Sequence, residues 1–344
     1  MIKQKKIDYL DYLRFICCLS VVMIHVFTTA RTDFINHTNI EELISRCIPQ
    51  ILHYAVPIFF MITGVLFLDE NRKVILKDYL KKYVLKYMII ILIFGGGYAF
   101  IEEVFKHNIN INGVITAIIN MIQGKSWAHM WYMYSLVGVM LFLPIIKTTI
   151  NSGKDITKYT LILLFISSVL YPLFQLFNTS IGIQLPMCSI YMFYTIYGYW
   201  LNKYSHEKRN TIIFVIAILL SILCIILFQY LSIWYNIEKF KSIGDYNSII
   251  TLLLSTSIFM LFKNIRKISN KNTLNIINLV CKESFGIYLI HMFYINIIYK
   301  LFKYNIYGKW MLLNGVIVYV IVFILSYITT YLLKKVSLMK KVLK

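Results

Sequence analysis

The chain has 344 residues, of which 59% are hydrophobic and only 15% are charged, and its mean hydropathy is +0.70. Soluble domains average about 45–50% apolar and about 25% charged residues, so the composition excludes that class and indicates a membrane protein with many spans. Lysine and arginine total 35 against 15 acidic residues, a surplus that in a soluble protein would suggest nucleic-acid binding but that here we expect mainly in cytoplasmic loops.

Ten apolar stretches approach or reach the length of about 20 residues that a helix needs to cross a bilayer. In chain order they are residues 8–29, 48–69, 83–103, 130–150, 158–178, 186–202, 211–231, 247–264, 276–299 and 310–333. The pattern predicts an all-α fold, a polytopic membrane helix bundle of about ten transmembrane helices. We interpret residues 1–344 as a single integral-membrane domain with no soluble domain.

The basic residues between these stretches predict the topology. With the N-terminus in the cytoplasm, 24 lysines and arginines fall on the cytoplasmic side and 9 on the outer side. Cytoplasmic loops carry the excess of lysine and arginine in membrane proteins. The distribution therefore favours ten helices with the N- and C-termini both cytoplasmic.

The first stretch contains two ionisable residues, Arg14 and His25, eleven positions apart. Eleven steps of about 100° amount to roughly three turns, so both side chains project from one helix face, about 16 Å apart along the axis. Ionisable side chains within a span are costly and usually functional. Each also has a structural explanation: Arg14, beside Asp11, could extend to the headgroups, and His25 could hydrogen-bond between helices.

Further histidines fall toward the outer ends of the predicted spans: His53 in the second, His129 in the fourth and His291 in the ninth. Neutral imidazole accepts a proton near neutral pH, which suits a general base. A metal site is the weaker interpretation, because no pair has the short spacing of ligands. The six cysteines are scattered as well, so we interpret them as apolar filling and expect neither disulfides nor a metal.

The densest basic run is KDYLKKYVLKY, residues 77–87, where the third stretch begins. Lys81, Lys82 and Lys86 either fix topology by contacting lipid headgroups or bind the phosphates of a cofactor as point charges. The triple glycine at 95–97 follows no predicted strand, so it is not a nucleotide-binding loop and more plausibly allows close helix packing.

Four segments along the chain resemble one family: LDYLRFICCLSVVMIH (10–25), AVPIFFMITGVLFL (55–68), HMWYMYSLVGVMLFLPII (129–146) and ESFGIYLIHMF (283–293). Together, and in this order, they resemble the acyltransferase-3 family of integral membrane acyltransferases. Within that family, they are most similar to the branch that O-acetylates surface polysaccharides.

The resemblance implies roles for individual residues. The family's first-helix basic residue and histidine match Arg14 and His25, which implies that His25 is catalytic and that Arg14 assists it. The acceptor-binding residues that we expect from the other motifs are His129, Trp131, Tyr132, Tyr134 and His291. For the aromatic residues among them, the alternative is an interfacial belt.

One position departs from the family pattern. Many members have two arginines, three residues apart, that contact the acyl-CoA at the start of the third helix, whereas this chain has Tyr83 and Lys86 there, beside Lys81 and Lys82. We therefore expect the three lysines, together with Arg14, to form the cofactor-binding site.

These inferences predict a multi-pass O-acetyltransferase of the cell membrane. It would move an acetyl group from cytoplasmic acetyl-CoA, its co-substrate, to a hydroxyl of a cell-surface or lipid-linked glycan, with membrane lipids but no nucleic acid as further partners. CoA is polyanionic and cannot cross lipid, so a basic cytoplasmic mouth would hold its phosphates. His25 would act as general base or as a transient acyl carrier. The alternatives are an exporter or translocation subunit without acyl transfer, and a catalytically silent assembly or sensing subunit.

Overall fold

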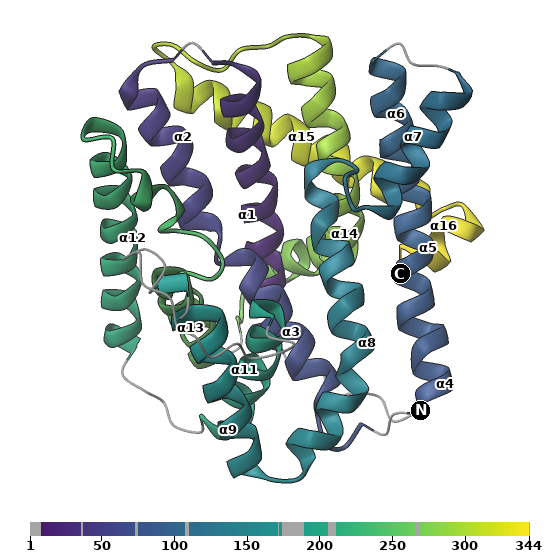
Figure 1. The fold of residues 1–344 in the computed structure, drawn as a ribbon, viewed down its shortest axis with the longest axis vertical. Coiled ribbons are helices and arrows are strands. Elements are labelled where there is room, and N and C mark those ends of the chain that lie inside the picture. Colours follow the sequence, from purple (N-terminus) through teal and green to yellow (C-terminus); the bar gives the residue numbers. More distant parts are fainter. Residues whose placement is uncertain are drawn as a thin grey trace. The chain divides into compact units, whose positions relative to one another are not determined.

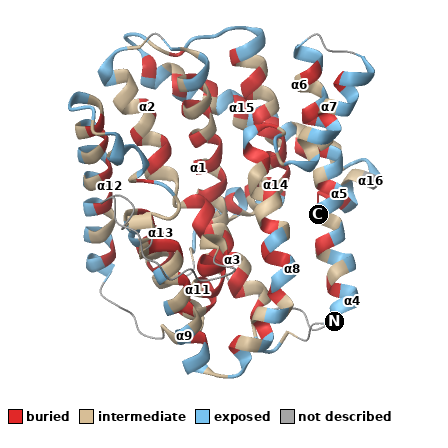
Figure 2. Cartoon of the chain, viewed as in Figure 1, coloured by how far each residue is buried: buried red, intermediate tan, exposed pale blue. Residues whose placement is uncertain are grey.

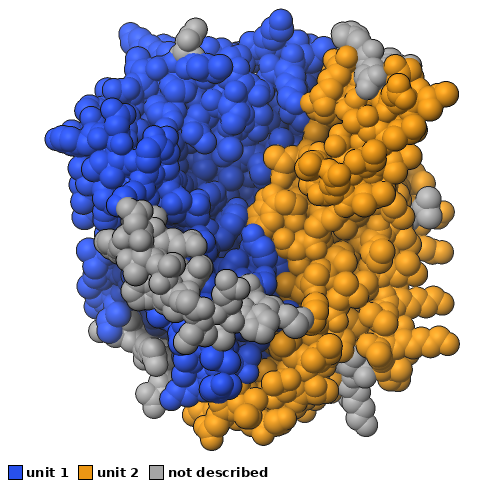
Figure 3. Space-filling view, viewed as in Figure 1, with its two compact units in different colours: residues 1–66, 158–331 blue, residues 67–157, 332–344 orange. Residues whose placement is uncertain are grey.

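The fold is that of a computed structural model, which describes residues 8–35, 37–72, 75–106, 110–170, 172–173, 189–205, 211–265 and 268–343 (Figure 1). Every regular element within these ranges is a helix, as the sequence predicted. The chain divides into two compact units, shown in different colours in Figure 3. Unit 1 comprises residues 1–66 and 158–331, and unit 2 comprises residues 67–157 and 332–344.

Unit 1 contains most of the long helices. They are α1 (Asp8–Asp33), α2 (Asn39–Leu52), α3 (Ala55–Phe67), α9 (Lys154–Phe165), α11 (Ile190–Tyr204), α12 (Thr211–Trp234), α13 (Ile249–Asn264), α14 (Lys271–Asn296) and α15 (Met311–Leu333), three of which extend a few residues past the unit boundary. A π-helical segment, Ile166–Leu170, follows α9, and another, Ile297–Leu301, follows α14.

The central helix of unit 1 is α1, which packs against α2, α13 and α14. Its most apolar 18-residue window has 61% of its residues buried, against 17% for α12 (Figure 2). An apolar helix surface outside the protein core requires lipid as its solvent, because water would make that exposure unfavourable. Most of the middle of α1 therefore lies inside protein, whereas α12 presents an apolar surface suited to lipid.

Unit 2 is built on one long, almost continuous helical run from Leu76 to Phe105. It consists of α4 (Leu76–Tyr79), a π-helical turn (Leu80–Val84), α5 (Leu85–Ile90), a second π-helical turn (Ile91–Gly95) and α6 (Gly96–Phe105). The other helices are α7 (Ile111–Ile122), the 3₁₀ turn Ala128–Met130, α8 (Trp131–Asn151) and the short α16 (Ser337–Val342). Of these, α7 packs on α6 and α16 packs on α5.

Seven helical segments among the described residues are long and apolar enough to span a membrane. They are Asp8–Asp33, Asn39–Phe67, Leu76–Phe105, Ala128–Asn151, Thr211–Trp234, Lys271–Leu301 and Met311–Leu333. The other three expected stretches contain the shorter helices α9, α11 and α13, and parts of the first two, together with Cys188, lie outside the described residues. The polytopic helical bundle is confirmed, and the count of ten stays a prediction.

The second stretch was predicted as one helix over 48–69, which is wrong in detail. The helical segment begins at Asn39, where Thr38 and Glu41 form a reciprocal capping box, and it breaks at residues 53–54 before α3 begins. The break follows from Pro57, which has no N–H to donate to the carbonyl of His53. His53 therefore lies between two helices rather than at the start of one. The helix α7 was not predicted at all.

Two motif glycines explain why these helices lie so close together. A Cβ added to Gly64 of α3 would lie 1.7 Å from the carbonyl oxygen of Thr195 in α11. A Cβ added to Gly286 of α14 would lie 2.1 Å from a methyl carbon of Thr330 in α15. Small residues at such crossings let backbones approach and gain van der Waals contact, which is the main attraction between helices in lipid.

Candidate active site

The helix α1 runs without interruption from Asp8 to Asp33, so Arg14 and His25 share the face that their spacing predicted. Arg14 Nη1 donates to Asp11 Oδ1 at 2.8 Å, which confirms the expected pair. The side chain of Arg14 is 31% exposed. It is therefore accessible to a ligand, but any anion that binds it shares the guanidinium with Asp11.

The side chain of His25 lies against His291 of α14. The two ring centroids are 5.0 Å apart and the ring planes are inclined by 46°. His291 is fully buried, and its Nδ1 donates to the carbonyl of Ile287, one turn earlier on the same helix, at 3.2 Å. This bond puts the proton on Nδ1 and makes Nε2 the acceptor atom of the neutral ring. His25 keeps partial exposure and so remains accessible.

A third histidine, His53, completes this histidine cluster. Both His53 and His291 are close enough to His25 to act on it electrostatically. The Nδ1 atom of His53 donates to the carbonyl of Gly244 at 2.8 Å, and the ring lies 4.8 Å from that of Tyr246. Residues far apart in the sequence thus hold three imidazoles in one part of unit 1. Among the described residues, no group of three or more His, Cys, Asp or Glu side chains could hold a metal ion.

Next to this cluster is a cavity of about 310 Å³ within unit 1, which we call the outer cavity. It is formed by α1, α2 and the loop before α13, and its lining includes Thr28, Arg31, Arg46, His53, Lys241 and Asp245. Thr28 lies three residues beyond His25 on α1, a rise of about 4.5 Å. The topology prediction places this end of α1 on the extracytoplasmic side. Partial burial raises the pKa of the Asp245 carboxyl to about 6.

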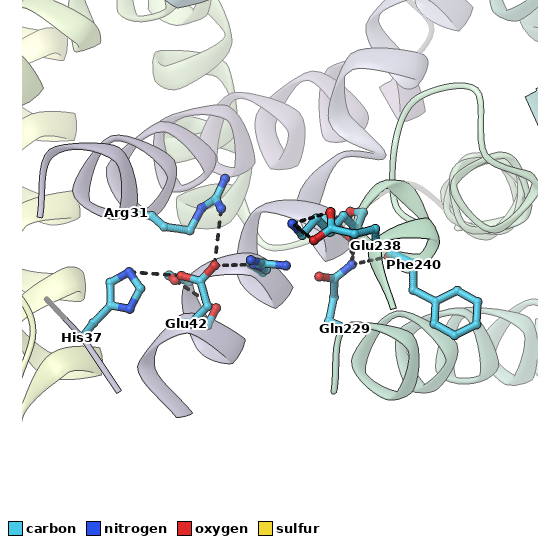
Figure 4. Close-up of polar contacts among 10 residues, drawn as sticks. Arg31, His37, Glu42, Gln229, Glu238 and Phe240 are labelled. Atoms are coloured by element: carbon cyan, nitrogen blue, oxygen red, sulfur yellow. Dashed lines mark hydrogen bonds and ion pairs between the residues drawn. The ribbon is translucent and has the colours of Figure 1, made fainter. Parts of the chain in front are cut away.

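The arginines of the outer cavity are positioned by one carboxylate, Glu42 of α2. Figure 4 shows Arg31 and His37 converging on this carboxylate, with contacts of 3.5 Å and 3.1 Å. Arg46 donates to the same carboxylate through Nε, one turn along α2. The side chain of Glu42 is only 13% exposed, so this pairing compensates the cost of burying its charge.

Amide groups fix the loop that closes the outer cavity. The Gln229 side chain of α12 donates to Gln50 Oε1 at 3.0 Å and to the carbonyl of Phe240 at 2.9 Å (Figure 4). Gln50 in turn donates to the carbonyl of Lys241 at 2.7 Å. Buried amides that satisfy backbone groups in this way hold a loop in one conformation.

The predicted cofactor-binding lysines belong to unit 2. Lys81 and Lys82 are exposed and Lys86 is half-buried. The sequence interpretation missed two neighbours. Arg72 lies 4.1 Å over the ring of Phe67 and donates to the Tyr83 hydroxyl at 2.6 Å. Lys334, which immediately follows α15, acts electrostatically on Lys86.

The predicted acceptor-binding residues of the fourth stretch also lie in unit 2. His129 is buried, with its ring 5.5 Å from that of Tyr98, which itself stacks on Trp127 at 4.3 Å. The indole N–H of Trp127 donates to Glu102 at 3.0 Å. The hydroxyl of Tyr134 donates to the carbonyl of Met121.

Two other residues of this motif, Trp131 and Tyr132, are half-buried and in contact with each other, with ring centroids 6.2 Å apart. Of the expected acceptor residues, only His291 shares a unit with His25.

The sequence profile of a family described as an acyltransferase domain matches residues 7–335. The chain belongs to the acyltransferase-3 family. No curated protein and no solved structure matches the chain. The match covers nearly the whole chain, including residues of both units, and confirms the family that the motifs resembled.

Family membership together with the helical fold makes this protein a multi-pass membrane acyltransferase. Most of the candidate site residues that the sequence analysis did not identify line the outer cavity: Arg31, Arg46, Lys241 and Asp245. Each of them lies outside the predicted spans or in a loop, where the sequence offered only topology as an explanation. The available signal was the polar, charged segment 37–46, whose glutamates and arginine recur at helical spacing.

Proposed function

We propose that this membrane acyltransferase moves an acetyl group from cytoplasmic acetyl-CoA to a hydroxyl of a cell-surface or lipid-linked glycan. The observation that carries the proposal is the His25–His291 pair beside a polar cavity, in a chain whose family transfers acyl groups. A pair of imidazoles, one buried and one accessible, next to a hydrophilic cavity suits a reaction that removes a proton from an alcohol.

In this proposal His25 is the general base. It takes the proton of the acceptor hydroxyl as that oxygen bonds to the thioester carbonyl carbon. The tetrahedral intermediate then collapses, the carbon–sulfur bond breaks, and the proton on His25 passes to the CoA thiolate. His291, fixed through Ile287, would hold the His25 ring in its reactive orientation. A basic site would accept the phosphates of CoA, for which we propose Arg14 and the lysines Lys81, Lys82 and Lys86.

The deciding experiment separates acyl transfer from export. Purified protein in proteoliposomes would receive acetyl-CoA labelled on the acetyl group, with de-O-acetylated surface glycan as acceptor. An enzyme transfers label to the glycan and releases free CoA in equal amounts, and His25→Ala stops both. Glycan movement across the bilayer without CoA release would instead establish the exporter alternative.

A further inference from the structure

The charges of the outer cavity point to the chemistry of its occupant. Among the residues that the structure describes, Arg31, Arg46 and Lys241 contribute three cations to its wall, and Asp245 contributes a carboxylate. The Asp245 carboxyl has a raised pKa, so part of its negative charge is lost at mildly acidic pH. Glu42 pairs with both arginines and Glu238 pairs with Lys241, so much of this positive charge is balanced, and what the wall offers an anion is the remaining N–H donors of these cations.

Both arginines retain donors for a ligand. Each guanidinium has five N–H donors, and the single carboxylate of Glu42 takes Arg46 through Nε and Arg31 through Nη1. Within the described part of the chain, the two terminal amino groups of Arg46 have no hydrogen-bond partner. Two amino groups in one plane are the arrangement that binds a carboxylate or phosphate bidentately.

The lining also argues against a site for a neutral sugar alone. Sites of that kind present aromatic faces and few charges, whereas among the described residues the one aromatic ring on this wall is the imidazole of His53. His53 is also an electrostatic neighbour of His25, and Thr28, about one turn beyond His25 on α1, lines the same cavity. An anion held by the arginines would thus lie a short distance from the imidazole that we propose as base.

We propose that the outer cavity binds an anionic substituent, a carboxylate or a phosphate, of the glycan acceptor, and that Arg31 and Arg46 are its specificity-determining residues. This inference rests on the proposed function. It narrows the acceptor from any glycan to an acidic one, in which the charged group anchors the sugar while a hydroxyl faces His25. Lys241, more exposed and paired with Glu238 at 2.6 Å, would add attraction at the cavity rim.

Binding without acetyl-CoA tests this proposal separately from catalysis. Three probes would be titrated into purified protein in detergent by ligand-observed NMR: hyaluronan tetrasaccharide, which carries carboxylates, glucose 1-phosphate, which carries a phosphate, and neutral chitotetraose. We expect at least one acidic probe to bind about tenfold or more tightly than chitotetraose, the fold-change of one charge-assisted hydrogen bond. Preference between the two acidic probes tells whether carboxylate or phosphate is the recognised group.

Variants assign that preference to the cavity. Arg31→Gln and Arg46→Gln should each reduce acidic-probe affinity about tenfold and leave chitotetraose unaffected. Arg46→Lys should restore part of the affinity, since charge returns without the planar fork. An arginine variant could lose its fold because it breaks a contact to Glu42. Lys241→Gln breaks no such contact, so its effect on acidic-probe affinity tests the cavity even if an arginine variant unfolds. The matched control is Lys239→Gln, an exposed lysine of the same loop that does not line the cavity.

Equal affinity for acidic and neutral probes, no binding of any probe at millimolar concentration, or equal losses in Lys239→Gln and the cavity variants would overturn the inference. These results leave the proposed function standing if labelled acetyl still reaches glycan. Conversely, acidic-probe binding that depends on the arginines, without acetyl transfer, would support the anion site and remove the acetyltransferase function.

Discussion

The groups that we propose for proton transfer and acceptor binding in unit 1 and those that we propose for cofactor binding in unit 2 are held in opposite ways. In unit 1, His53 and His291 each donate Nδ1 to a backbone carbonyl, and Glu42 fixes two arginines. In unit 2, Lys81 and Lys82 are exposed on long side chains. Bond-making requires reacting groups in fixed geometry, whereas attraction of a polyanion tolerates movement. Substitutions of the histidines in unit 1 should therefore change mainly the rate of acetyl transfer, whereas substitutions of the exposed lysines in unit 2 should change mainly the affinity for acetyl-CoA.

The largest effect should come from the fixed imidazoles. His25→Ala should lower kcat for acetyl transfer by about 10²–10⁴-fold, the usual loss of a general base. The KM for acetyl-CoA should change little. The measurement is the turnover of labelled acetyl-CoA. The variant must first show the melting profile of the wild type in detergent.

A matched change at His291 completes this comparison. His291→Ala should lower kcat less than His25→Ala, because we assign His291 a positioning role. A folded His25→Ala protein with near wild-type turnover would contradict the role of His25 as the base. His291 would then be the next candidate base.

Each unit also contains a lysine that holds backbone carbonyls, and here the units should behave alike. Lys147 of α8 is buried and donates to the carbonyls of Phe67, Asp69 and Arg72. Replacing it leaves those acceptors without their charged donor, so Lys147→Met should cost about 1–3 kcal/mol of stability. Thermal unfolding in detergent measures this loss.

The unit 1 counterpart is Lys263 of α13, which donates to the carbonyls of Leu201, Asn202 and Ser205 at 2.7–3.0 Å. Lys263→Met should cost about the same. The exposed Lys125→Met serves as control and should melt like the wild type. A wild-type melting profile for both the Lys147→Met and the Lys263→Met protein would show that these bonds add no net stability.

The lysines of the 77–87 run in unit 2 should affect affinity rather than rate. Replacing Lys81, Lys82 and Lys86 together by glutamine should raise the KM for acetyl-CoA about tenfold and make it less salt-dependent, with kcat nearly unchanged. Lys154→Gln with Lys158→Gln removes two other exposed charges on the predicted cytoplasmic side and should leave KM unchanged. If both sets shift KM equally, the 77–87 run serves topology alone.

The smallest effect should be a pH dependence in the outer cavity. The pKa of Asp245 is raised to about 6, so its carboxyl is mostly neutral at about pH 5 and mostly ionised at about pH 7. Rising pH therefore adds a negative charge to the wall and should weaken acidic-probe binding roughly threefold.

Asp245→Asn isolates that contribution. The other charged or titratable groups at the cavity are Arg31, Arg46, Lys241 and His53, with Glu42, His37 and Glu238 behind them, and all are unchanged in the variant. The difference in pH slope between wild type and Asp245→Asn thus reports Asp245 alone. Identical slopes would assign the pH dependence to groups other than Asp245.

The sequence alone determined that the protein lies in lipid, that its fold is helical, and that Arg14 and His25 share one face of α1. Apolar length and sparse charge require lipid, and a helix of fixed pitch places Arg14 and His25 on one face whatever surrounds it. The four motifs also identified the family, which the profile match confirmed. Each of these is a local or additive property of the chain, so it can be read without knowing which segments meet.

The tertiary structure decided which histidines meet. The predicted spans placed His53, His129 and His291 at similar depths in the membrane. Of these three, packing of α14 and the 244–246 loop brings His53 and His291 toward His25 within unit 1. The outer cavity likewise unites α1, α2 and a loop some 200 residues away in the chain. A helix fixes the angle and rise of its own side chains but not its partner, because helix pairing in lipid depends on surface shape and small-residue contacts that arise only when both helices are present.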